Sequence, residues 1–71
     1  MSTRDFLVAV GDDLRKTATQ MEKFITAMEN EFIDTVEQIR EVTDEQYKQL
    51  GFPVGLVNAI KKRLNGGADG A

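Results

Sequence analysis

Apolar residues recur through the first half of the chain at the spacing of an amphipathic helix. Alternating intervals of four and three residues place one set on a single helical face: Leu14, Ala18, Met21, Ile25, Met28 and Phe32. The pattern predicts a helix over about residues 12–31, preceded by a short helix over residues 5–10 that Gly11 interrupts. The stripe fits a core face or a coiled-coil seam, and its length of about three heptads favours the core.

Two capping signatures predict short helices in the middle of the chain. Asp34 is followed three residues later by Glu37, a variant of the capping box, in which the two residues exchange hydrogen bonds across the first helical turn. Thr43 and Gln46 form a second such pair. The second of these helices is expected to end just before Gly51, because glycine readily adopts the left-handed conformation that closes a helix.

The last helix is predicted to begin at Pro53, which cannot extend the preceding helix but suits the first position of a new one. Its apolar face holds Val57, Ile60 and Leu64, at spacings of three and four residues. Residues 66–71 include three glycines among six residues. Such a composition is typical of a disordered tail or a linker stub.

Strand signals are weak, since no run alternates β-branched and polar residues and no Asn-Gly or Asp-Gly turn joins two apolar segments. The sequence therefore predicts one all-α domain over residues 1–65, a bundle of four or five helices. The residues expected to form its core are Leu14, Met21, Ile25, Phe32, Val36, Ile39, Leu50, Phe52, Val57, Ile60 and Leu64.

The side-chain inventory excludes most enzyme chemistry. The 71 residues include no cysteine and no histidine, and the only serine is Ser2. A thiol nucleophile, an imidazole base, a Ser-His-Asp arrangement and a Cys/His zinc site are therefore absent. The paired carboxylates do not follow the spacing of an EF-hand loop. We expect no catalysis, no cofactor, no metal and no small-molecule substrate.

Charge is unevenly distributed along the chain, whose net charge is −3. Residues 22–45 carry eight acidic and two basic residues, a net of −6, whereas residues 54–71 carry three basic residues and one acidic residue, a net of +2. This distribution argues against a nucleic-acid binder, which needs a broad basic face. It suits contacts between copies of the chain.

The first residues lack the basic region and apolar run of a secretory signal. The longest apolar run, Phe6 to Val10, is too short to span a bilayer. The lack of cysteine is compatible with a reducing compartment. A soluble cytoplasmic protein without membrane attachment is expected.

The segment ENEFIDTVEQIREVTDEQYKQLGF, residues 29–52, resembles the middle of a sterile alpha motif (SAM) domain. The residues that carry the resemblance are Asn30, Phe32, Asp34, Val36, Ile39, Val42, Thr43, Tyr47, Leu50, Gly51 and Phe52, with Gly55, Ile60 and Leu64 downstream. The front of the chain departs from the family pattern at residues 11–14, and Leu56 stands where the family often has a basic residue. The resemblance implies five helices with a long last one, and a non-enzymatic interaction module.

By the same resemblance, an acidic mid-loop surface of one domain would join an end-helix surface of another SAM-like domain or of a second copy. The expected mid-loop residues are Asp34, Glu37, Glu41, Asp44 and Glu45. The expected end-helix residues are Val54, Gly55, Leu56, Asn58, Lys61 and Lys62. Leu56 lies one position from the predicted core stripe and is expected to be partly exposed as an apolar anchor, although it could instead pack under the loop of residues 51–53.

Two alternatives remain open from the sequence. The segment GFPVG, residues 51–55, resembles the helix-hairpin-helix turn that holds a DNA phosphate, and some SAM domains bind RNA hairpins through the same helix start. Nucleic-acid binding is therefore the first alternative. The second is a coiled-coil dimer formed through the stripe of residues 14–32.

Overall fold

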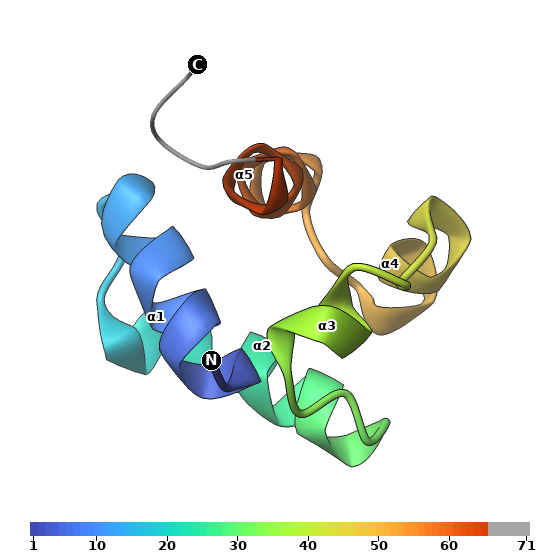
Figure 1. The fold of residues 1–71 in the computed structure, drawn as a ribbon. Helices are drawn as coiled ribbons and strands as arrows, with labels where there is room; N and C mark the ends of the chain where they lie inside the picture. Colours follow the sequence, from blue (N-terminus) through green and yellow to red (C-terminus); the bar gives the residue numbers. More distant parts are fainter. Residues whose placement is uncertain (66–71) are drawn as a thin grey trace.

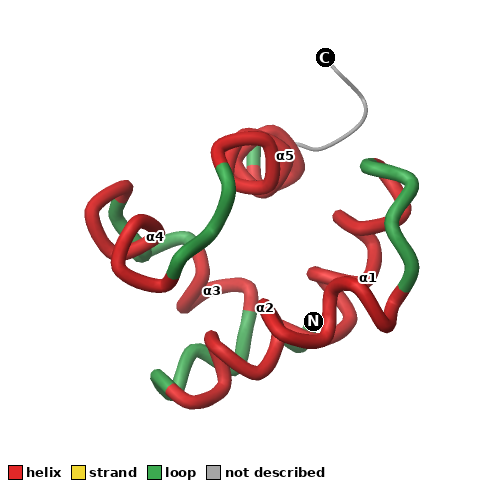
Figure 2. The backbone as a smooth tube through the Cα atoms, turned by 180° about the vertical axis from the view of Figure 1, so that it is seen from behind, coloured by secondary structure: helices red, strands yellow, loops and turns green. Residues whose placement is uncertain are grey.

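Five helices follow one another through residues 1–65, the part of the chain that the computed structural model describes. They are α1 (Thr3–Asp13), α2 (Ala18–Asn30), α3 (Val36–Ile39), α4 (Asp44–Leu50) and α5 (Val54–Leu64). α1 packs against α2 and α5, while α4 lies on the opposite side of the bundle from α1 (Figure 1). Figure 2 shows from behind that short loops join the helices.

The predicted all-α class is confirmed for residues 1–65, which contain no strand. The final helix, α5, has 11 residues, and α2 is the longer of the two with 13. The tail expected over residues 66–71 lies outside the described residues.

The first two helices meet closely at Gly11, and this corrects the predicted boundary between them. α1 continues through Gly11 and ends at Asp13, so the helix expected over residues 12–31 begins only at Ala18. A Cβ atom at position 11 would lie 2.5 Å from Cγ of Met21. Glycine therefore allows α1 and α2 to approach each other, and it does not interrupt the helix.

Arg15 reverses the chain between α1 and α2 in the left-handed conformation, with φ of 59°. The next N–H, of Lys16, donates to the carbonyl oxygen of Gly11 at 2.7 Å, as in a Schellman motif. Glycine usually occupies this turning position, so the sequence offered no recognisable stop signal here. Thr17 and Gln20 then form a capping box at the start of α2.

The predicted capping residue is correct for α4 and is off by one residue for α3. Thr35, and not Asp34, caps α3: its hydroxyl accepts the Gln38 N–H at 3.3 Å, and the Gln38 side chain accepts the Thr35 N–H at 3.0 Å. The predicted pair of Thr43 and Gln46 at α4 is confirmed.

The end of α4 and the start of α5 follow the sequence closely. Gly51 closes α4 with φ of 80°, as predicted. Pro53 precedes the first helical residue of α5, Val54, instead of occupying that position itself. Such one-residue differences are common at helix ends.

The N-terminal residues fasten α1 to the loop between α2 and α3. Thr3 is buried, with 1% of its surface exposed, and its hydroxyl donates to the carbonyl oxygen of Ile33 at 2.8 Å. The backbone N–H of Thr3 donates to the backbone carbonyl oxygen of Asp34 at 2.8 Å, and the backbone N–H of Val36 donates to the carbonyl oxygen of Met1 at 3.1 Å. Backbone groups of the loop thereby find hydrogen-bond partners in the first residues of the chain.

The core lies between the five helices and is built from α1 as much as from the others. Its buried apolar residues are Phe6, Leu7, Val10, Met21, Ile25, Met28, Ile39, Tyr47, Phe52, Leu56 and Ile60. The rings of Phe24 and Phe52 meet edge to face at 5.1 Å between centroids, a favoured aromatic geometry. Because Met21, Ile25 and Met28 are fully covered within one chain, α2 has no free apolar seam for a coiled coil.

Most predicted core residues are buried or packed against the core, but Phe32 is not. The residues that are partly buried against the core are Leu14, Val36, Leu50, Val57 and Leu64. Phe32, in contrast, is 80% exposed, so its predicted core position is wrong. The reason is local: α2 ends at Asn30, and Phe32 has φ of 59°. Its side chain therefore leaves the helical stripe that the spacing had implied.

Candidate functional site

An open groove lies between the start of α2 and the start of α5. Its volume is about 620 Å³. Apolar side chains of Leu14, Met21, Phe24, Pro53 and Leu56 line it, together with Gly55 and the polar residues Lys16, Thr19, Gln20 and Lys23. An apolar lining with a few polar groups at its edge is the usual character of a binding site.

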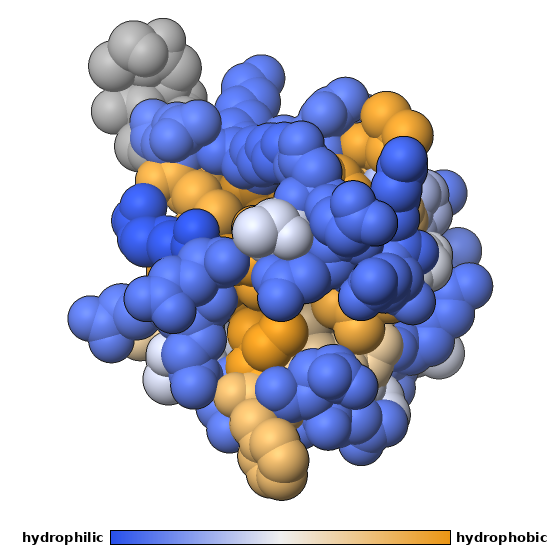
Figure 3. Space-filling view, turned by 90° about the vertical axis from the view of Figure 1, so that its right-hand side faces the viewer, coloured by the Kyte–Doolittle hydropathy of each residue, from blue (hydrophilic) through white to orange (hydrophobic). Residues whose placement is uncertain are grey.

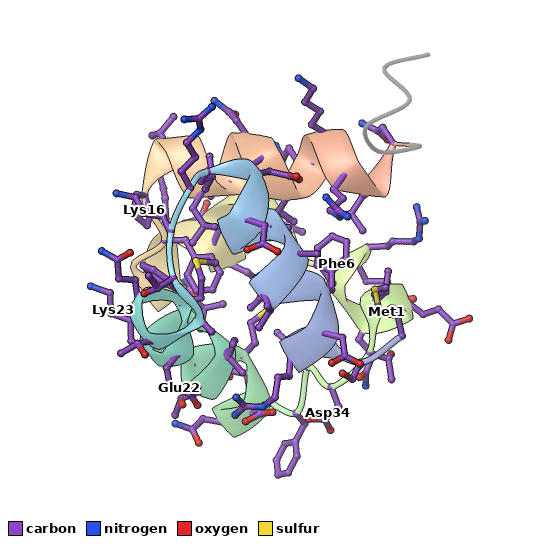
Figure 4. All side chains as sticks on the ribbon, turned by 90° about the vertical axis from the view of Figure 1, so that its left-hand side faces the viewer. Met1, Phe6, Lys16, Glu22, Lys23 and Asp34 are labelled. Atoms are coloured by element: carbon purple, nitrogen blue, oxygen red, sulfur yellow. The ribbon has the colours of Figure 1, made fainter. Side chains whose placement is uncertain are left out.

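Two lysines give the edge of this groove a positive charge. Lys16 and Lys23 project from the same side of the molecule, at its left edge in Figure 4. Nζ of Lys23 lies 5.1 Å from the centroid of the Phe24 ring, a cation–π distance. Neither lysine forms an ion pair with another residue in the range 1–65. Both ammonium groups are therefore available to an acidic ligand.

The start of α5 borders the groove and is open to solvent. Pro53 gives no side-chain hydrogen bond to the first turn of α5, and a Cβ atom at Gly55 would meet no heavy atom within 4 Å. Unpaired N–H groups at a helix start carry partial positive charge. This adds to the charge of the two lysines.

The end-helix residues expected from the sequence are mostly exposed, but Leu56 is a correction. Val54 is 75% exposed, whereas Leu56 is only 4% exposed, so its predicted role as an exposed anchor is wrong. Leu56 lies four residues before Ile60, and these two side chains form the buried stripe of α5. Val57, expected on that stripe, is only partly buried beside it.

Three of the other expected α5 residues line a second, smaller hollow next to the groove. Gly55, Asn58 and Lys62 border this hollow of about 370 Å³, which shares Leu14 and Gly55 with the groove. The structure thus brings three of the predicted end-helix residues together. The groove itself was missed from the sequence, because its lysines precede α5 by more than 30 residues.

The expected acidic residues are all exposed, but one of them contacts the basic helix of the same chain. Asp34, Glu37, Glu41 and Glu45 face solvent. The carboxylate of Asp44 forms an ion pair with Lys61, and Arg63 pairs with Asp13. Asp44 and Lys61, expected on two separate binding surfaces, therefore face each other within one molecule.

Phe32 is the second site that the sequence did not reveal. Its N–H donates to the carbonyl oxygen of Glu29 at 3.0 Å, and the Ile33 N–H donates to Met28 at 2.9 Å, a Schellman arrangement in which glycine is usual. Phe32 borders a shallow hollow of about 430 Å³ with Glu31 and others. Figure 3 shows apolar atoms projecting at the lower end of the molecule, where Figure 1 places the α2–α3 connection.

Three side chains with a shifted pKa, Arg4, Glu22 and Tyr47, are not among the residues that line the groove. The guanidinium of Arg4 donates to both carboxylate oxygens of Glu22 at 2.9 Å, which lowers the pKa of Glu22 and raises that of Arg4. Burial raises the pKa of the Tyr47 hydroxyl, and Asp44 adds to this. Within residues 1–65, no three histidine, cysteine or acidic side chains gather into a metal site.

Comparisons of the chain with models of protein families, with curated proteins and with solved structures found no match. Of the helices between residues 1 and 65, none combines the length and the apolar character needed to cross a bilayer.

Proposed function

We propose that the chain is a non-enzymatic protein-interaction module, acting as a scaffold or adaptor, and that the groove between α2 and α5 is its binding site. The ligand is an apolar segment flanked by acidic residues. The observation that carries this proposal is the combination of an apolar lining with two unpaired lysines at the edge. A cytoplasmic location, which the sequence led us to expect, is also part of this proposal.

The two features of the groove have different roles. Burial of apolar ligand surface supplies affinity, at about 25 cal/mol for each Å² removed from water. The ammonium groups of Lys16 and Lys23, with the start of α5, favour carboxylates at the edge and speed association. An apolar side chain between carboxylates therefore matches both features.

Nucleic-acid binding finds less support in the structure than in the sequence. Two of the three basic residues in the last part of α5, Lys61 and Arg63, are held in ion pairs with Asp44 and Asp13. The cations left near the start of α5 are too few for the broad phosphate contact that nucleic acid requires. The net charge of −3 opposes it as well.

A peptide titration tests the proposal. The probe is a capped hexapeptide with one phenylalanine and one leucine between acidic residues, followed by amide chemical shifts of the labelled chain. We expect the largest shifts at Lys16–Phe24 and Val54–Leu56, with binding weakened at least about fivefold by Lys23→Glu. Lys48→Glu makes an equal charge change at an exposed position of α4, is the matched control and should leave binding close to that of the parent.

Shifts confined to other surfaces would contradict the proposed site, as would equal effects of Lys23→Glu and Lys48→Glu. A matched peptide with lysines in place of its acidic residues should bind more weakly. If it binds as well, the charge argument is wrong. Tighter binding of an RNA hairpin than of the peptide, with a steep salt dependence, would favour the nucleic-acid alternative.

A further inference from the structure

We infer that Asn65, the C-cap residue of α5, is a site of spontaneous deamidation, in which its side-chain amide is converted to a carboxylate. Asn65 is exposed, and Gly66 follows it in the sequence. Asparagine is one of the thermolabile residue types of proteins, and the reaction needs only water from the solvent. The site is independent of the proposed function, because Asn65 is not among the residues that line the groove.

Deamidation begins when the backbone nitrogen of the residue after asparagine attacks the side-chain carbon Cγ. A bond forms between these two atoms, the bond from Cγ to Nδ2 breaks, and ammonia leaves with the proton from the attacking nitrogen. The product is a cyclic imide. Water then opens the imide at either of its carbonyl carbons, which gives aspartate or its isomer isoaspartate. Both products carry a carboxylate in place of the neutral amide.

Two features favour this reaction at Asn65. Glycine has no Cβ atom, so a glycine after asparagine leaves the approach of its backbone nitrogen to Cγ unhindered. The helical backbone also ends before this position, since α5 ends at Leu64 and Asn65 has ψ of 37°, outside the α-helical range. The attack therefore does not require a helical turn to open.

The two other asparagines of the chain provide a comparison, because both are exposed as well. Asn58 lies inside α5, where each N–H donates to the carbonyl oxygen four residues earlier. Asn30 ends α2, and the N–H of the next residue, Glu31, donates to the carbonyl oxygen of Met28 at 3.0 Å. At both positions a hydrogen bond holds the nitrogen that would attack. Backbone structure, and not exposure, therefore distinguishes Asn65.

The new carboxylate would lie beside basic side chains. Asn65 borders a hollow of about 200 Å³ that Arg40 and Lys61 also line, and the guanidinium of Arg40 donates to the carbonyl oxygen of Leu64 at 3.0 Å. A negative charge at the end of a helix is repelled by the helix dipole, whereas the two cations attract it. Because Lys61 is already paired with Asp44, Arg40 supplies most of this attraction. Deamidation thus adds one negative charge whose repulsion is offset locally.

Peptide mass spectrometry of the full chain after incubation at neutral pH tests the site. We expect Asn65 to gain one mass unit, as aspartate and isoaspartate, and to do so faster at alkaline pH, because the attacking nitrogen must lose its proton. The free peptide RLNGGA, residues 63–68, gives the rate without a fold, and the full chain should react at a similar rate. Asn30 and Asn58 should react at least about tenfold more slowly, which corresponds to about 1.4 kcal/mol of local opening.

Three variants test the role of each group. Gly66→Ala adds a Cβ atom next to the attacking nitrogen, and Asn65→Gln would require a larger imide ring, so both should retain the amide when the parent has lost it. Asn58→Gln changes another exposed asparagine and is the matched control, in which Asn65 should react as in the parent.

The variant Asn65→Asp carries the product charge and tests the attraction to Arg40. It should unfold at about the urea concentration of the parent, whereas adding it to Arg40→Gln should lower the midpoint below that of Arg40→Gln alone. An equal fall with and without Arg40 would overturn the local offset.

Three results would overturn the site itself. They are a reaction of Asn65 more than about tenfold slower in the full chain than in the free peptide, an equal rate at Asn58, and an unchanged rate in Gly66→Ala.

Discussion

Replacing Gly11 by alanine adds one methyl group at the closest approach of α1 and α2. The added Cβ atom would lie 2.5 Å from Cγ and 3.2 Å from Sδ of Met21, and 3.3 Å from the carbonyl oxygen of Lys16. Met21 is itself 2% exposed. Its Cγ lies near the backbone, so the side chain cannot avoid the methyl group by moving its tip alone.

Two opposing effects set the magnitude of this change. Alanine is favoured over glycine within a helix by about 0.5–1 kcal/mol. Overpacking a buried site costs about 1–3 kcal/mol. The second effect is larger, so Gly11→Ala should lower the free energy of unfolding by about 1–2 kcal/mol. In a domain of this size, that corresponds to a fall in Tm of about 5–10 °C.

Gly55→Ala provides the matched comparison, because a Cβ atom there meets no heavy atom within 4 Å. Only the helix preference remains, and the variant should be more stable than the parent by about 0.5 kcal/mol. Urea and thermal unfolding followed by circular dichroism at 222 nm measure both variants.

The same assay decides whether packing against Met21 is the cause. Shortening Met21 to alanine should relieve part of the Gly11→Ala cost, so the double variant should be more stable than the sum of the single effects by about 1 kcal/mol. A Gly11→Ala protein as stable as Gly55→Ala would refute the close-approach argument. Additive single effects would refute the role of Met21.

Three further outcomes are expected from the core, the N-terminal fastening and the surface ion pair. Phe52→Ala should lower the free energy of unfolding by about 3–4 kcal/mol in urea titration, because a buried ring is lost; an unchanged midpoint would contradict its core position. Thr3→Val keeps the shape but removes the donor to Ile33, and should cost about 1 kcal/mol in the same assay. Arg4 lowers the pKa of Glu22 in the folded state, so this pair stabilises the fold above the ordinary glutamate pKa and the contribution is lost as pH falls through the lowered value. In Arg4→Gln, the urea midpoint should therefore depend less on pH between pH 6 and 3, and an unchanged profile would contradict the pairing.

Local signals explain which parts of the fold were predictable from the sequence. The caps at Thr43 and Gln46 and the turn at Gly51 depend on hydrogen bonds and backbone preferences within a few residues. The helical class, the apolar face of α2 and the burial of Phe52 and Ile60 follow from spacing and turn chemistry in the same way.

Tertiary contacts decided the rest. The sequence indicated that Gly11 interrupts a helix, and only the position of Met21 on the neighbouring helix shows that the missing side chain of Gly11 permits packing. Phe32 was expected in the core and is exposed, whereas Leu56 was expected to be partly exposed and is buried. The reason is that periodicity places residues on a helix but does not determine where the helix ends or which side of it faces the core. The groove depends on the same information, since Lys16 and Lys23 reach the start of α5 only after the chain has folded back on itself.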